Sequence, residues 1–349
     1  MSVVARGTDS SVVAFAGTAG GGVYRYGASE KGWQPAAYGF AAQKINTVAW
    51  HPLEPQIIYG GGVGGIWKST DRGTNWSQVW GASDTIAQMA IDPVQAGVVY
   101  AVGTGVWKSI DGGASWSHLP LGVTNPSPYS RNLLVSPSDP QVLFCIDTAL
   151  VVKSDDGGQT WRGVQVKTPP RLPYNLGGDI AFHTTKTNTL YCTKYGVGVF
   201  RSADDGESWV RRPGAGLVEK NVNGLAVSPT KGDTLFAATY DGVYRSTDGG
   251  ASWRLAGLDG WDVSSISISQ EDGRLVYART YTSRRGTRGV FNSVDGGNSW
   301  RLTSNGLPPK HRDIWRIVQS PSERDTVLAI SFEGGLYISS SGNAPGHSP

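Results

Sequence analysis

The chain has 349 residues, and its composition indicates a protein built from many short strands. Gly accounts for 48 residues, about twice its usual share in globular proteins. Trp and Tyr contribute 13 and 14 residues, beside only 2 Met. The absence of a Gly-X-Y period excludes collagen, and a charged fraction of 17% is low for a mainly helical protein. The composition therefore favours an all-β fold with tight turns.

Charge and cysteine content narrow the expected partners. A formal charge of +3 is too small to predict a nucleic-acid surface, and no apolar run approaches the length of a membrane span. Two cysteines are too few for a disulfide framework. Arg6 and Asp9 interrupt what would be the apolar part of a secretion signal. We therefore expect a cytoplasmic protein, unless a signal has been removed, with no nucleic-acid partner and no membrane span, and we expect it to be monomeric.

In chain order, the first predicted repeat is degenerate. Residues 1–6 fit a short strand, and the stretch GVYRYGASEKGW follows, with Ala28 and Glu30 where later repeats have Asp and Gly. The next six repeats each contain a box of the form SxDxGxxW. Consecutive boxes start 40 to 48 residues apart, at Ser69, Ser109, Ser154, Ser202, Ser246 and Ser293. This period is typical of the four-stranded blades of a β-propeller.

Each repeat reads as four short strands, which we name A to D from the innermost outwards. TIAQMAIDP, GVVYAVG, GVWKSID and ASWSHL illustrate the four, each bounded by Gly, Pro or Asp. The second strand carries an aromatic residue followed by a small one at Phe15, Tyr59, Tyr100, Phe144, Tyr191, Phe236 and Tyr277, and Leu328-Ala329 varies the pair. The last repeat, GLYISSSGN, stops after strand C.

These repeats predict an all-β, single-domain propeller over residues 1–349, with residues 341–349 as a flexible tail. Each blade is expected to be a four-stranded antiparallel sheet. Eight blades are favoured, and seven blades with overlapping termini are the alternative. Either ring is expected to close between the chain ends, because closure removes exposed sheet edges.

The recurring carboxylates of the boxes are predicted to form turns. The Asp can accept backbone N–H bonds in the hairpin between strands C and D, the Gly supplies a positive φ, and the Trp packs between sheets. We therefore predict structural rather than catalytic or calcium-binding roles for Asp71, Asp111, Asp156, Asp204, Asp248 and Asp295.

The boxes resemble those of the Asp-box (BNR) propellers, which include sialidases, xyloglucanases, sortilin-type receptors and photosystem II assembly factors. The resemblance covers nearly the whole chain and implies the fold, whereas one fold hosts many functions. The Phe/Tyr-Arg-Ile-Pro motif of sialidases is absent, and Ile314 to Ile317 only echo it. Residues 51–69 are similar to the first blade of xyloglucanase-type enzymes, in which an Asp precedes Val-Gly-Gly, but Gly62 stands there in this chain. Photosystem assembly factors are similar in size, and that resemblance implies a docking protein.

A ligand is expected on the face formed by the D-to-A and B-to-C loops, where the inner strands begin. Strand alternation places a polar rim there, at Thr47, Gln88, Asn132, Asp179, Gly224, Ser265 and Arg316. Asp179 and Arg316 are its charged members, and they either orient a ligand or tie blades together. The nearby loops add Arg131, Tyr240, Trp261, Arg279 and Trp315, together with a basic stretch at Arg284, Arg285 and Arg288. Such loops serve a partner, or they are simply solvated.

We predict a rigid propeller that binds a protein partner or a glycan-like or small polar ligand through these residues. The alternative is an enzyme with its site at the channel mouth, either a diverged glycoside hydrolase or a cyclase or lyase, with Asp179 as the candidate catalytic residue. No cofactor is expected, and no metal site, because the five His show no ligand spacing. Cys145 and Cys192 occupy the same position in successive blades, too far apart for a disulfide.

Overall fold

The computed structural model of the chain describes the following ranges: residues 13–18, 22–27, 33–35, 45–54, 56–71, 75–95, 97–120, 132–146, 151–164, 178–194, 196–212, 214, 216–217, 221–269, 273–283, 289–302, 314–319, 327–331 and 335–339. Before residue 45 and after residue 302 the description is confined to the backbone of strands. Strands joined by turns make up these ranges, which contain no helix, so the predicted all-β class is confirmed. No helix in them is long and apolar enough to cross a membrane.

Strand pairing groups 29 strands into eight antiparallel sheets. Three sheets have three strands each: β1 (Val13–Thr18), β2 (Gly22–Gly27) and β3 (Trp33–Pro35); β4 (Ile45–Trp50), β5 (Ile58–Ser69) and β6 (Ser77–Thr85); and β27 (Ile314–Gln319), β28 (Val327–Ser331) and β29 (Gly335–Ser339).

The other five sheets have the predicted four strands. They are β7 (Gln88–Ile91), β8 (Val99–Val102), β9 (Val106–Ser109) and β10 (Ser117–Leu119); β11 (Asn132–Val135), β12 (Leu143–Ile146), β13 (Val151–Ser154) and β14 (Arg162–Val164); β15 (Ile180–Phe182), β16 (Leu190–Lys194), β17 (Gly198–Ser202) and β18 (Val210–Arg211); β19 (Val222–Val227), β20 (Leu235–Thr239), β21 (Gly242–Ser246) and β22 (Arg254–Gly257); and β23 (Trp261–Ile268), β24 (Val276–Ser283), β25 (Gly289–Ser293) and β26 (Arg301–Leu302).

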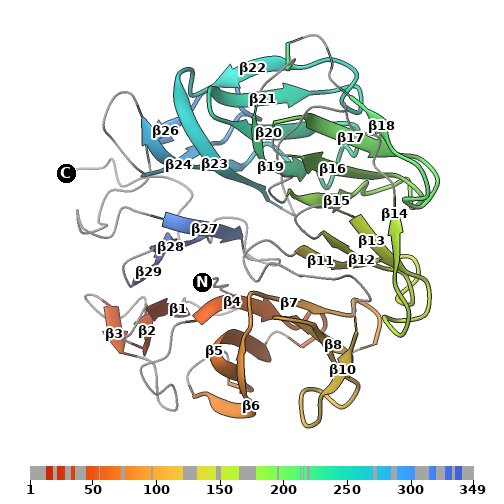
Figure 1. The fold of residues 1–349 in the computed structure, drawn as a ribbon. Helices are drawn as coiled ribbons and strands as arrows, with labels where there is room; N and C mark the ends of the chain where they lie inside the picture. The colour runs from red at the N-terminus through yellow and green to blue at the C-terminus, as the bar shows by residue number, and fades with distance from the viewer. Residues whose placement is uncertain are drawn as a thin grey trace.

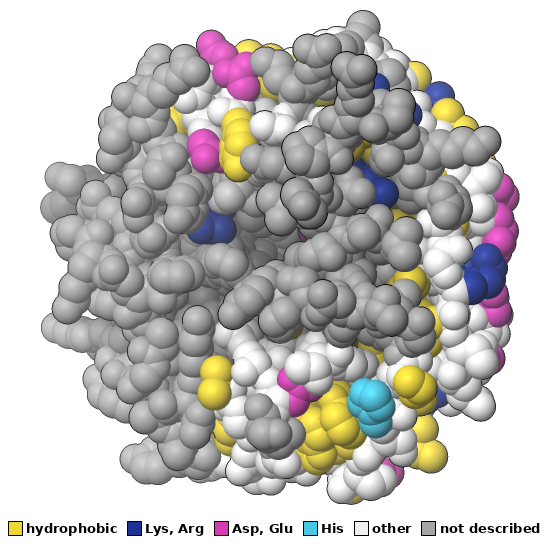
Figure 2. All heavy atoms as spheres, viewed as in Figure 1, with side chains coloured by type: hydrophobic (Ala, Val, Ile, Leu, Met, Phe, Trp, Pro, Cys, Tyr) yellow, Lys and Arg dark blue, Asp and Glu magenta, His cyan; other side chains and the backbone are white. Residues whose placement is uncertain are grey.

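The sheets are arranged as blades around a centre (Figure 1). The first strands of consecutive sheets, from β4 through β7, β11, β15, β19 and β23 to β27, lie beside one another, as expected for innermost strands. At the ends of the chain β1 lies beside β29. The propeller fold is thus confirmed. The blade number and the single domain stay predictions, since they depend on these terminal sheets. Among the described side chains on the face seen in Figure 2, charges of both signs are interspersed.

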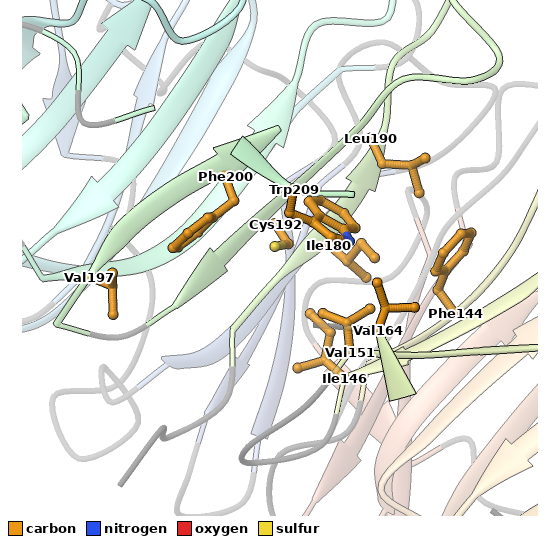
Figure 3. Close-up of a cluster of buried hydrophobic side chains, with 10 residues drawn as sticks. All are labelled: Phe144, Ile146, Val151, Val164, Ile180, Leu190, Cys192, Val197, Phe200 and Trp209. Atoms are coloured by element: carbon orange, nitrogen blue, oxygen red, sulfur yellow. The ribbon is translucent and has the colours of Figure 1, made fainter. Parts of the chain in front are cut away.

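Apolar side chains from two neighbouring sheets fill each interface, which we call a seam. In the seam between the β11–β14 and β15–β18 sheets, Phe144 and Val151 pack with Leu190, Cys192 and Trp209 (Figure 3). Cys145 and Cys192 are both buried and free, in agreement with their predicted role as small core residues. Burial raises the pKa of the Cys192 thiol to about 12, which makes it unreactive.

The aromatic residue of the second strand packs on the box of the next sheet for Tyr59, Phe144 and Phe236. An added Cβ at Gly297 would lie 2.7 Å from Cε1 of Phe236, and one at Gly113 would lie 3.2 Å from Cε1 of Tyr59. Both glycines also have positive φ, of 85° and 91°. Glycine is therefore required there twice, for its backbone conformation and for the space that the ring occupies.

The predicted hydrogen bonds of the boxes are present. In the box that starts at Ser109, Asp111 Oδ1 accepts bonds from the Ser109 hydroxyl at 2.8 Å and from the Ser115 backbone N–H at 2.9 Å. The Ser115 hydroxyl donates to Asp111 Oδ2, and the Gly113 N–H donates to Ser109 Oγ at 2.7 Å. The same set recurs around Asp156, Asp204, Asp248 and Asp295. The carboxylates thus hold turns, and the hydroxyl residue before the Trp belongs to the motif.

The turn after each inner strand uses a buried polar residue in a similar way. Nδ1 of His183 accepts the backbone N–H groups of Thr185 and Lys186 at 3.1 and 3.0 Å. Asp92 Oδ1 accepts two N–H groups at the matching place in the β7–β10 sheet. Burial lowers the pKa of His183, although Asp233 opposes that shift. A buried His or Asp that follows the inner strand therefore caps these turns.

We predict that Asp205→Gly stabilises the protein. Asp205 has φ of 54°, in the left-handed region, at a box position that is Gly with positive φ in the boxes of Asp111, Asp156, Asp248 and Asp295. Removing its Cβ relieves strain of about 1–2 kcal/mol, which the greater freedom of unfolded Gly partly offsets, so a gain of about 0.5–1 kcal/mol is expected in urea denaturation. Asp205→Ala keeps the strain and serves as the control. If the Asp205→Gly variant were less stable than the parent, the assignment would be contradicted.

We also predict that the boxes lose stability in acid. Hydrogen bonds from the hydroxyls of Ser115, Thr160 and Ser252, followed by backbone N–H groups, lower the pKa values of Asp111, Asp156 and Asp248 to about 2. Because these pKa values are depressed from about 4 in the unfolded chain, the stabilisation is complete above pH 4 and is lost as the pH falls towards 2.

Ser115→Ala tests this through the melting temperature measured by circular dichroism. The variant is expected to melt below the parent at pH 6, and the difference is expected to shrink between pH 4 and pH 2 as Asp111 becomes protonated. Ser117→Ala, at an exposed position in β10, is the control. A difference that stays constant across this range would rule out the role given to the Ser115 hydroxyl.

Candidate functional site

The polar rim at the start of the inner strands links neighbouring sheets. Gln88 Oε1 accepts the N–H of Leu133 at 3.0 Å, and Asn132 Nδ2 donates to the carbonyl of Gly178 at 3.0 Å. Asn46 and Asn223 make corresponding bonds to the carbonyls of Ile86 and Val263. Each of these bonds crosses a seam. Gln88 and Asn132, both predicted ligand-binding residues, therefore also tie blades together.

Asp179 is the central member of this rim. Its Oδ1 accepts a bond from Asn132 Nδ2 at 2.8 Å, and its Oδ2 accepts the N–H of Leu225 at 3.1 Å. Its own N–H donates to Thr193 Oγ1 at 2.9 Å. An added Cβ at Gly224 would lie 3.3 Å from Asp179 Oδ2, so the glycine leaves room for the carboxylate. Asp179 thus joins three sheets, and a catalytic role for it stays a prediction.

Bulges decide which residues reach across the seams. The register between β4 and β5 shifts between Ile45 and Thr47, and the register between β19 and β20 shifts between Val222 and Gly224. The extra residues, Asn46 and Asn223, make the cross-seam bonds to Ile86 and Val263. Strict alternation does not hold at a bulge, which explains why the sequence pattern selected the neighbouring positions.

The other predicted site residues lie on the β19–β22 and β23–β26 sheets, on β27, or outside the described residues. Tyr240 is 46% exposed, whereas Arg279 is only 5% exposed. The indole of Trp261 packs edge-on against Phe291, with ring centroids 4.9 Å apart. For Trp315 only the backbone is described, and it is the extra residue where the register of β27 and β28 shifts. Arg131, the side chain of Arg316 and the basic stretch 284–288 fall outside the described residues.

A carboxylate beside Arg279 has a perturbed pKa. Burial raises the pKa of Asp262, and the positive charge of Arg279 opposes that shift. Asn223 Nδ2 lies 3.4 Å from Asp262 Oδ1. This group combines a partly buried acid with a buried cation near the start of β23, and the sequence placed Arg279 on the loop face.

A row of aromatic rings lies along the seam between the β4–β6 and β7–β10 sheets. The rings of Trp80 and Trp107 have centroids 4.5 Å apart, and Trp107 meets His118 edge-on at 4.8 Å. Trp116 adjoins Trp80 at 6.2 Å. The three indoles are partly exposed, and His118 is exposed. On the face shown in Figure 2, a histidine lies beside a group of hydrophobic side chains. We call Trp80, Trp107, Trp116 and His118 the aromatic row.

Asp84 fixes the loop at one end of the aromatic row. Its carboxylate accepts the N–H of Thr104 at 2.9 Å, the Thr104 hydroxyl at 2.9 Å and Nε1 of Trp107 at 3.3 Å. An exposed neighbour, Gln78, donates to the carbonyl of Gly64 at 2.8 Å. The Trp107 end of the row therefore lies on a rigid part of the B-to-C and D-to-A side. The sequence did not predict the row because Trp116 is a box residue and Trp80 lies in a strand. The signal that could have indicated it was the combination of Trp80 and Asp84 in VWGASD, outside the repeated motif.

Within the described residues, no group of three or more His, Cys, Asp or Glu side chains is placed to hold a metal ion. The polar groups named above on this side of the propeller include the amides of Gln88 and Asn132, the carboxylates of Asp84 and Asp179, and the imidazole of His118. This arrangement can hold a ligand by ring stacking and hydrogen bonds.

The chain was compared with known proteins. No family model matches it. A curated relative, the probable oligoxyloglucan-reducing end-specific xyloglucanase of Neosartorya fischeri, is 23% identical over 304 residues, which cover 69% of this chain and 34% of that enzyme. The chain thus matches about a third of the length of this relative, and a smaller share of a second xyloglucanase from Emericella nidulans.

Solved structures share the fold. The GH74 enzyme of Niastella koreensis superposes with a TM-score of 0.62 at 18% identity, over 97% of this chain and 64% of that one. YCF48 bound to D1 peptide superposes with a TM-score of 0.64 at 14% identity, over 97% of this chain and 99% of that one. The resemblance to xyloglucanase and photosystem-assembly propellers is therefore confirmed at the level of the fold, and neither of these proteins matches closely.

We predict that Asp179→Asn lowers the stability of the protein. The amide cannot accept from both Asn132 Nδ2 and the Leu225 N–H without placing its own NH₂ against a donor. A loss of about 1–3 kcal/mol in the free energy of unfolding is expected in urea denaturation. Asp259→Asn, at an exposed turn, is the control. Equal stability of the Asp179 variant and the parent would show that the cross-seam bonds contribute nothing.

Proposed function

We propose that the protein is a binding propeller that holds a peptide segment of a partner protein on its B-to-C and D-to-A side. The aromatic row carries this proposal, because three partly exposed indoles and an exposed imidazole lie in contact on the surface. Aromatic side chains in such positions provide large contact areas at a small cost in conformational entropy.

The surroundings of the aromatic row suit a peptide. The ring contacts and the bonds of Asp84 to Thr104 and Trp107 hold the surface in one conformation, which lowers the entropic cost of binding. Gln78 and His118 stand at its edge with polar atoms that can pair with a peptide backbone. Apolar rings bordered by polar groups are typical of interface hot spots.

One of the similar structures supports a propeller that binds a peptide. This chain and YCF48 bound to D1 peptide cover nearly the whole of each other, whereas the Niastella enzyme extends well beyond the matched region. At the place where the family resemblance implies a catalytic Asp, this chain has Gly62, which pairs with Ile45 in the β4–β5 ladder. Both carboxylate oxygens of Asp179 accept bonds across seams. These observations favour binding over hydrolysis.

A glycan is the second candidate ligand. Sugar rings also stack on indoles, and the curated relatives are xyloglucanases. A peptide and a glycan would bind the same aromatic row, so one set of variants can distinguish the two classes of ligand.

The test uses a peptide array and an oligosaccharide array, each probed with the parent protein and with the variants His118→Ala and Trp80→Ala. We expect saturable binding to a subset of peptides. Loss of one ring from the row is expected to weaken that binding about tenfold or more, the usual effect of truncating a hot-spot aromatic residue.

Val94→Ala is the matched control, since Val94 is 61% exposed on the same sheet and lies in the turn after its inner strand. It should leave binding unchanged. Binding confined to oligosaccharides would replace the peptide by a glycan. Peptide binding that is equal in the parent and both row variants would place the site elsewhere.

A further inference from the structure

The seams on the box side of the propeller share a basic residue that reaches the next sheet. This residue directly precedes the box Ser. Lys68 Nζ donates to the carbonyl of Gly112 at 2.7 Å, Lys108 Nζ to that of Gly157 at 3.0 Å, and Arg245 Nη1 to that of Gly296 at 2.9 Å. Because this bond recurs from seam to seam, the seams can be compared position by position for the charged groups that surround the basic residue.

One seam contains carboxylates that neutralise its basic groups. Between the β11–β14 and β15–β18 sheets, Lys153 Nζ lies 2.7 Å from Glu207 Oε1 and 3.0 Å from Asp155 Oδ1. Arg162, at the start of β14, also pairs with Glu207 and lies 3.1 Å from Asp155 Oδ2. Hydrogen bonds from Arg162 and then Lys153 lower the pKa of Glu207. Two cations and two carboxylates are therefore balanced.

The seam between the β19–β22 and β23–β26 sheets has the same two cations without the carboxylates. Arg245 corresponds to Lys153, and Arg254 corresponds to Arg162. The residue matching Glu207, five positions after the box Ser, is Asn298, and the residue matching Asp155 is Thr247. Arg254 Nη2 donates to Asn298 Oδ1 at 3.2 Å. An amide oxygen thus stands where the other seam has a charged one.

The electrostatics of this seam follow from that substitution. Burial and, second, the positive charge of Arg254 lower the pKa of Arg245. Neither arginine takes part in an ion pair with the described residues, and Nε of Arg245 is buried without a hydrogen-bond partner among them. Arg254 is exposed, so the pair can be reached from solvent. Two neighbouring guanidinium groups without an anion attract one.

We propose that Arg245 and Arg254 form a binding site for a carboxylate from an acidic segment of a partner protein. The incoming group would supply, beside the Asn298 amide, the negative charge that Glu207 supplies in the equivalent seam, and would accept charge-assisted hydrogen bonds from the two guanidinium groups. We infer a carboxylate because the equivalent pair of cations, Lys153 and Arg162, binds the carboxylate of Glu207. This site lies on the box side and is independent of the aromatic row.

The test measures the binding of a fluorescein-labelled hexaglutamate peptide by fluorescence anisotropy at low salt. The parent protein is expected to bind it saturably and more weakly as salt is added. Asn298→Glu places a carboxylate in the site from within, so it is expected to weaken peptide binding about tenfold and to raise the melting temperature.

Arg254→Gln is a second variant, at an exposed position that is expected to leave folding intact. It should weaken binding about fivefold. Val94→Glu adds the same charge as Asn298→Glu on a distant sheet, and it should bind like the parent.

Three results would overturn the proposal. One is the absence of saturable binding by the parent protein. Another is parent-like binding by both Asn298→Glu and Arg254→Gln. The third is displacement of the peptide by inorganic phosphate at an equal concentration of anionic groups, which would indicate a phosphate site instead.

Discussion

The propeller depends on the contact between the aromatic ring of one blade and the box glycine of the next. Phe236 on Gly297 and Tyr59 on Gly113 are examples, and at each the positive φ of the glycine leaves its Cβ position to the ring. A basic side chain spans the same contact, lying over the ring and bonding the neighbouring carbonyl, as Lys68 does with Tyr59 and Gly112. Because the contact recurs from seam to seam, each blade orients the next and the ring is built from local geometry.

This repetition determines where function can reside. The repeated polar residues already make structural hydrogen bonds. The box carboxylates hold turns, and Gln88, Asn132 and Asp179 bond the neighbouring blade at the rim. A ligand therefore has to use positions where one repeat departs from the others. Trp80 and Asp84 beside Thr104 are one departure, and the unneutralised Arg245 and Arg254 are another. These two lie on opposite sides of the propeller.

Much of the fold was predictable, since the box, its spacing and the aromatic pair of the second strand are local signals that repeat. The candidate site was less predictable. Strand alternation predicted rim positions at Thr47 and Gly224. Because each strand has a bulge there, Asn46 and Asn223 also reach the neighbouring sheet. A bulge depends on how a strand pairs with its neighbour, which a single strand sequence does not record. The aromatic row was not predicted because Trp80 lies on one sheet and Trp107 and His118 lie on the next, so Trp80 meets Trp107 only across the seam.

The sequence by itself determined the class of fold, the turn role of the six box carboxylates and the side of the propeller on which loops vary. It did so because each of these rests on residues within one repeat. Only the tertiary structure decided that Asp179 joins three sheets, that Trp80 packs against Trp107, and that Asn298 stands where Glu207 neutralises the equivalent seam. These are contacts between residues about 25 to 50 positions apart, brought together when blades pack side by side.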